Sequence, residues 1–149
     1  MKDVKQGADR IVHLTRIIPP LLLKIPESEF ARKPAPQKWS KKQIIGHLVD
    51  SATNNHHRFT RSRIDSSANI FYNQDEWNNL THYNEMNSGD LIHLWEYYNK
   101  LIAHIILYLK PSDLQLKCHT GENEYTLEYL ILDYVEHLEH HLRQVLKYD

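Results

Sequence analysis

The sequence predicts an all-α fold, a four-helix bundle with long connections. Only 4 glycines occur in 149 residues, and the alternation of apolar and polar side chains that marks β-strands is hard to find. Apolar residues instead recur at three- and four-residue steps in four segments of about 20 residues each. A helix of that length spans about 30 Å and cannot bury its apolar stripe alone. Packing four such helices together is the simplest arrangement.

The first two helices carry clear local signals. We expect the first over residues 4–25, where apolar side chains line one face. Pro19 and Pro20 should kink or break this helix, because neither residue can donate a backbone hydrogen bond. The second helix is expected over residues 41–63. The Ser-x-x-Gln sequence that begins at Ser40 forms a capping box, in which each side chain satisfies a free backbone amide.

The third helix, expected over residues 89–109, has the clearest apolar periodicity. Asn87 or Ser88 can cap its start, and Pro111 should end it. The last helix is expected over residues 126–147, again with one apolar stripe that faces the core.

The connections over residues 26–40 and 64–87 are long. Such lengths argue against an up-down-up-down bundle, which needs only tight turns. Long loops in a compact domain are often functional, or they cover an open end of the core.

Composition limits the function classes. Apolar residues make up 41% and charged residues 25%, which are ordinary globular values, and the length predicts a single domain over residues 1–149. The formal net charge of −1 gives no reason to expect nucleic acid or an acidic membrane as a partner. No signal peptide or membrane-spanning segment is visible, and Cys118 is the single cysteine. We therefore expect a cytoplasmic protein without a disulfide framework.

The chain has 11 histidines, and helical phase divides them. His47 lies on the shoulder of the apolar stripe of the second helix, and His137 and His141 flank the stripe of the last helix. A pair at the four-residue spacing of His137 and His141 is expected about once by chance in so histidine-rich a chain. The other histidines fall on polar faces, at a stripe edge or in connections: His13, His56, His57, His82, His93, His104, His119 and His140.

Two histidines one helical turn apart can share a metal ion, and a third from a neighbouring helix would complete a three-nitrogen site. An open fourth position is typical of catalytic rather than structural zinc sites. Neutral imidazole suits Zn²⁺, Ni²⁺, Cu²⁺ or Fe²⁺. Gln144, Asp133 or a backbone carbonyl could serve as an outer partner of a ligand. The alternative is that the three histidines are polar core residues satisfied by hydrogen bonds.

Several segments carry a resemblance to a known family. Residues 39–51, WSKKQIIGHLVDS, and residues 136–144, EHLEHHLRQ, resemble the second-helix and final-helix signatures of the DinB-like superfamily. Three further stretches are similar to its YfiT-like branch of metal-dependent hydrolases: Asp50-Ser51 with Asn54 and Arg58-Phe59; residues 70–77, IFYNQDEW; and Ile18-Pro19-Pro20.

The resemblance implies a DinB-type four-helix bundle in which His47, His137 and His141 bind a divalent metal, with zinc or nickel as first choices. It also implies a small-molecule substrate and a homodimer. Relatives include transferases that join bacillithiol or mycothiol to an electrophile, thiol-dependent isomerases, and proteins labelled as hydrolases. A metal could hold either a low-molecular-weight thiol as thiolate or an activated water. The alternative is a non-catalytic metal-binding or helical interaction bundle.

Four further polar residues are candidate substrate contacts or anchors of the loops around the site: Asn54, Arg58, Gln74 and Asp75. For Arg58 and Asp75, a surface salt bridge is an equal alternative. Leu138 follows His137, where HExxH metalloproteases carry their general base, which counts against peptide hydrolysis. Neither mechanism needs Cys118, which we expect to be structural or incidental.

Overall fold

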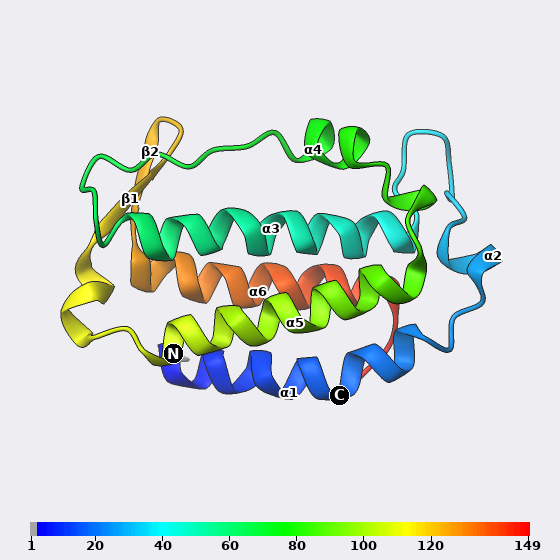
Figure 1. The fold of residues 1–149 in the computed structure, drawn as a ribbon, viewed down its shortest axis with the longest axis horizontal. Helices are drawn as coiled ribbons and strands as arrows, with labels where there is room; N and C mark the ends of the chain where they lie inside the picture. Colours follow the sequence, from blue (N-terminus) through cyan, green and yellow to red (C-terminus); the bar gives the residue numbers. More distant parts are fainter. Residues whose placement is uncertain (1–2) are drawn as a thin grey trace.

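The computed structural model describes residues 3–149 and contains the four long helices that the sequence predicts (Figure 1). In chain order the helices and strands are α1 (Val4–Leu22), α2 (Glu27–Phe30), α3 (Lys41–Arg61), α4 (Gln74–Thr81), the 3₁₀ turn η1 (Tyr83–Glu85), α5 (Ser88–Leu107), the 3₁₀ turn η2 (Pro111–Gln115), β1 (Lys117–Thr120), β2 (Asn123–Thr126) and α6 (Leu127–Val145). The long helices α1, α3, α5 and α6 form the bundle.

The bundle does not follow the up-down-up-down order. Helices α1 and α3 each pack mainly against α5 and α6, so α1 and α3 lie on one diagonal of the bundle, and α5 and α6 on the other. Figure 1 shows that α3 and α5 run in the same direction, opposite to α1 and α6. Since α3 and α5 are parallel neighbours, the chain between them must return along the whole bundle. That return explains the long connection over residues 62–87, as the sequence analysis anticipated.

The predicted helix starts are confirmed. Ser40 and Gln43 form the capping box of α3, with backbone-to-side-chain distances of 3.0 and 2.9 Å in the two directions. The side chain of Asn87 caps α5 by accepting a hydrogen bond from Asp90. Thr126 caps α6 by accepting one from the backbone N–H of Tyr129.

All four long helices end two or three residues before their predicted ends. Helix α1 is not broken by Pro19 and Pro20 but runs through both and ends at Leu22, before the predicted end at residue 25. Both prolines lie in the last turn of α1. The backbone N–H of Leu23, just after the helix, donates to the Pro19 carbonyl at 3.0 Å. Helix α5 ends at Leu107, before the proline expected to stop it.

The hairpin of β1 and β2 was not expected, because strands of four residues are too short to show an alternating pattern. Gly121, with φ of +75°, forms its turn. An isolated parallel bridge joins Asn69 to His119, and the Ile70 N–H donates to the His119 carbonyl at 2.9 Å. The hairpin thereby holds the chain that leaves α3.

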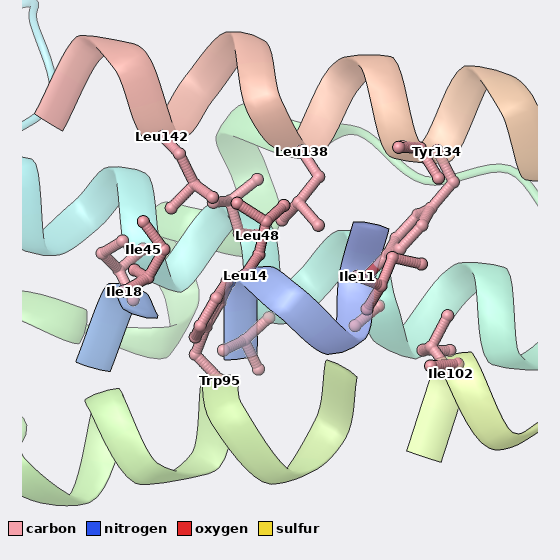
Figure 2. Close-up of a cluster of buried hydrophobic side chains, with 14 of the residues drawn as sticks. Ile11, Leu14, Ile18, Ile45, Leu48, Trp95, Ile102, Tyr134, Leu138 and Leu142 are labelled. Carbon is pink, nitrogen blue, oxygen red and sulfur yellow. The ribbon is translucent and has the colours of Figure 1, made fainter. Parts of the chain in front are cut away.

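The core lies between the four long helices, and each contributes buried side chains to the cluster in Figure 2: Ile11, Leu14 and Ile18 from α1, Ile45 and Leu48 from α3, Trp95 and Ile102 from α5, and Tyr134, Leu138 and Leu142 from α6. Two residues of the expected stripe on α5, Leu94 and Leu101, are instead exposed. No helix in residues 3–149 is both long and apolar enough to pass through a membrane.

Candidate metal centre

The structure brings together the three histidines that helical phase selected. His47 comes from α3, and His137 and His141 come from successive turns of α6, its antiparallel neighbour. His47 is completely buried, and the other two are partly buried. The Nε2 atoms of His47 and His137 are 3.0 Å apart, and the ring centroids of the three pairs lie between 4.5 and 4.9 Å.

The environment keeps these imidazoles neutral. Burial lowers the pKa of His47 to about 3, and the two neighbouring imidazoles add to this effect. Burial and the neighbouring His141 and His140 lower the pKa of His137 to about 4. The pKa of His141 is also lowered, chiefly by burial. A neutral imidazole has a free lone pair on one nitrogen, which is the form that a metal ion binds.

The donor atoms fit a divalent metal. One nitrogen from each histidine lies within 4.8 Å of the other two. Two nitrogens bound to a tetrahedral zinc, at bonds of 2.0–2.1 Å, are themselves about 3.3 Å apart. The Nε2 atoms of His47 and His137 are already near that separation. No cysteine or carboxylate belongs to this cluster within residues 3–149, so it offers three imidazoles alone.

Gln144 fixes the orientation of the third histidine. Its Oε1 lies 3.0 Å from Nδ1 of His141. An amide oxygen can only accept, so Nδ1 carries the proton and Nε2 keeps its lone pair. The amide nitrogen of Gln144 lies 3.2 Å from Nε2 of His140, an exposed residue outside the cluster. Gln144 thus has the place expected of an outer partner of a metal ligand.

Aromatic residues enclose His47. The ring of Trp39, just before the capping box, lies 4.9 Å from the imidazole at an angle of 34°. The buried Nδ1 of His47 has no hydrogen-bond partner among the described residues. A ring in this position is shielded from bulk water, which is the main cause of its low pKa.

A second buried arrangement beside His47 was missed by sequence reasoning. The ring of Tyr83 lies against the backbone of Gly46, where a Cβ atom would come within 2.2 Å of it. Its hydroxyl donates to Oδ1 of Asp50 at 2.5 Å, and burial raises the pKa of that carboxyl to about 6. The glycine inside a helical segment was the available signal, since it marks a close approach.

The candidate residues Asn54 and Arg58 continue the polar line from His47 along α3. Asn54 is buried, and its amide donates to the Asp50 carbonyl at 2.9 Å. Nε and Nη2 of Arg58 donate to the carbonyl of Ile70 at 3.2 and 3.0 Å. The guanidinium thereby anchors the long connection, which is one of its two predicted roles. The alternative, a surface salt bridge, does not form: Arg58 has no ion pair within residues 3–149.

Gln74 and Asp75 form no side-chain hydrogen bond with the clustered histidines within residues 3–149. Both are exposed in the first turn of α4, which Asn73 caps by accepting from the N–H of Asp75 at 3.1 Å. Tyr72, just upstream, is the residue of this segment that approaches the site. Burial raises its pKa, and the nearby guanidinium of Arg58 partly offsets this.

The fold is similar to a solved one. The structure of YfiT from Bacillus subtilis, described as a probable metal-dependent hydrolase with an unusual four-helix bundle topology, matches with a TM-score of 0.78 at 19% identity. The match covers 93% of this chain and 83% of that one. No curated protein matches the chain.

The family itself is shown by sequence. The model of the DinB superfamily matches residues 11–145, a span that includes all four long helices in whole or in large part and all three clustered histidines. The chain therefore belongs to the DinB superfamily.

Proposed function

We propose that this protein is a metal-dependent enzyme that transfers a low-molecular-weight thiol to an electrophilic small molecule. His47, His137 and His141 hold the metal. The observation that carries the proposal is the convergence of three neutral imidazoles, without a carboxylate, on one point between α3 and α6.

The metal would contribute one effect: it would make the thiol that binds it more acidic. A divalent ion lowers the pKa of a coordinated thiol, so the sulfur is a nucleophile at neutral pH. The thiol would lose its proton to solvent, its sulfur would form a bond to the electrophilic carbon, and the leaving group would depart with the electron pair of the bond that breaks. The protein's own thiol, Cys118, is buried in β1 and takes no part, so the reacting thiol comes from a co-substrate.

The chain's residues prepare the site for this reaction. The low pKa values of His47 and His137 keep their lone pairs available at neutral pH. Gln144 holds the tautomer of His141. Burial of the cluster limits the water that would compete with the thiol for the metal.

Hydrolysis is the second candidate, and one observation favours it. Asp133 lies one helical turn before His137 on α6, and partial burial raises its pKa above the usual carboxylate value. A carboxylate there could accept a proton from an attacking water. The match to a fold described as a probable metal-dependent hydrolase is consistent with this alternative.

The test is a rate measurement on protein purified without a histidine tag and loaded with zinc or nickel. Chloronitrobenzene is offered with a panel of small thiols, and a panel of activated esters and amides is offered without thiol. We expect thioether formation faster than with free thiol, and loss of that rate in His141→Ala. Rates equal to the free thiol across the panel would exclude the transferase, and ester or amide cleavage would favour the hydrolase. Metal uptake with neither activity would indicate a non-catalytic metal-binding protein.

A further inference from the structure

A line of polar residues leads along α3 from the histidine cluster to an arginine. His47, Ser51, Asn54 and Arg58 are spaced by four, three and four residues, which places them on one face of the helix. His47 and Arg58 are eleven residues apart, about 16 Å along the axis. Helical side chains lean toward the N-terminus, so the long side chain of Arg58 reaches back toward the histidines.

Arg58 is a half-buried cation whose hydrogen-bond partners within residues 3–149 are all neutral. Two of its nitrogens donate to the Ile70 carbonyl, and Nη1 lies 3.4 Å from Oδ1 of Asn55. These bonds use three of the five N–H groups of the guanidinium. Asp133, whose charge also acts on Arg58, forms no ion pair with it among residues 3–149.

The fold treats its other enclosed cations differently. Lys42, which is 2% exposed, donates to a carboxylate oxygen of Glu27 at 2.9 Å. Arg10 donates to Glu139 at 2.6 Å. A charge withdrawn from water is costly unless an opposite charge meets it. Arg58 is thus a partly desolvated cation without a carboxylate of its own, in a chain that otherwise supplies one.

The groups around this guanidinium belong to the same site. Its charge is among the causes of the lowered pKa of His137, and it acts on Tyr72 in the connection that crosses α3. Ser51 and Asn54 between the arginine and the histidines are buried and neutral. A ligand that binds at the histidine cluster and extends along α3 therefore meets a cation at its far end.

We propose that Arg58 anchors a carboxylate of the ligand, and that the thiol taken by this protein is consequently an acidic one. This inference rests on the proposed thiol chemistry at the histidine cluster. The two remaining N–H groups of the guanidinium supply charge-assisted hydrogen bonds to the carboxylate. Arg58 then determines specificity, while the histidines hold the metal that binds sulfur.

The test compares two thiols that differ in one group, mercaptohexanoate and mercaptohexanol. Each is titrated into nickel-loaded protein, and the sulfur-to-nickel charge-transfer absorption reports binding. Because charge-assisted hydrogen bonds are strong, we expect the acid to bind at least about tenfold more tightly than the alcohol at low salt. Shorter and longer acid–alcohol pairs locate the chain length with the largest preference.

The variants separate specificity from structure. Arg58→Gln should abolish the preference for the acid and leave the affinity of the alcohol unchanged, whereas Arg58→Lys should retain part of the preference. Arg61→Gln is the matched control, because it removes the same charge from an exposed position three residues further along α3. The preference of Arg61→Gln for the acid over the alcohol should equal that of the wild type.

Three outcomes would overturn the inference. The first is equal binding of acid and alcohol by the wild type, which leaves the thiol chemistry intact. The second is an equal loss of both affinities in Arg58→Gln, which assigns Arg58 to anchoring Ile70 alone. The third is an absence of any absorption change with every thiol, which removes the proposed function together with this inference.

Discussion

Two faces of the bundle carry histidines, and they differ in chemistry. On the face formed by α3 and α6, three histidines converge, are partly or wholly buried, and have lowered pKa values. On the face formed by α1 and α5 lies a groove of about 650 Å³, lined in part by His93 and His104. Those two are eleven residues apart, about 16 Å along the helix, and cannot share an ion.

Two charged residues of the α1–α5 groove pair with each other. Glu96 pairs with Lys100 at 2.6 Å and lies 3.6 Å from Nδ1 of His93. Both histidines are exposed there, so water solvates them. The α1–α5 groove therefore lacks the convergent, buried histidines that a metal site needs. What identifies the metal site is a four-residue spacing on one helix, a third histidine from a neighbouring helix, and burial of the cluster.

The largest expected difference between the two faces is in metal affinity. His141→Ala removes one of three donors, and we expect its zinc affinity to fall by more than about 100-fold, since loss of an outer partner alone costs about 10–100-fold. His93→Ala should retain the wild-type affinity. Competition with a chromogenic chelator, on protein without a histidine tag, measures both. Equal losses in the two variants would show that the α3–α6 cluster is not the site.

Two glycines, Gly46 in α3 and Gly7 in α1, allow the tightness of packing on the two sides of the bundle to be compared. In Gly46→Ala the new Cβ would meet the Tyr83 ring at 2.2 Å, so we expect a loss of about 2–3 kcal/mol in the free energy of unfolding. In Gly7→Ala of α1 the nearest atom, on Val135, is 3.3 Å away. There the helix propensity of alanine should offset the contact and give a change between zero and a gain of about 1 kcal/mol. Urea unfolding of both variants gives the comparison, and a stable Gly46→Ala would contradict the tight packing beside His47.

The low pKa values predict how many protons zinc displaces. Three histidines with the ordinary pKa of 6.5 would be mostly protonated at about pH 5.5, and zinc would release about 2.7 protons on binding. Since the pKa values of His47 and His137 are lowered to about 3 and about 4, these two carry almost no proton at that pH. We expect release of fewer than one proton. Calorimetry in two buffers with different ionisation heats measures the number, and a release of two or more would contradict the buried neutral cluster.

Local signals explain which features could be predicted from the sequence. The capping box at Ser40 and the apolar periodicity fixed the positions of the long helices to within a few residues at their ends. Helical phase selected His47, His137 and His141, because the apolar stripe of a helix indicates which of its sides faces the core. The family resemblance pointed to the same three residues.

Contacts between distant segments could not be predicted. The bond from Tyr83 to Asp50 joins residues 33 apart, and neither residue shows a pattern that indicates the other. Arg58 was a candidate loop anchor, but nothing in the sequence indicated that its partner would be the Ile70 carbonyl. Gln74 and Asp75 shared a motif with Tyr72, but the N-terminal turn of α4 leaves both exposed.

The smallest expected effect concerns the outer partner of the cluster. Gln144→Ala leaves all three donors in place but frees His141 to rotate and change tautomer, so zinc affinity should fall by about tenfold. Gln144→Glu keeps an oxygen acceptor for Nδ1 and should retain or raise the affinity, because a carboxylate makes the imidazole more basic. His140→Ala removes the other partner of the Gln144 amide but no donor of the cluster, and we expect a smaller loss than in Gln144→Ala. If Gln144→Ala and Gln144→Glu lowered the zinc affinity equally, Gln144 would act on the packing of α6 and not on the orientation of His141.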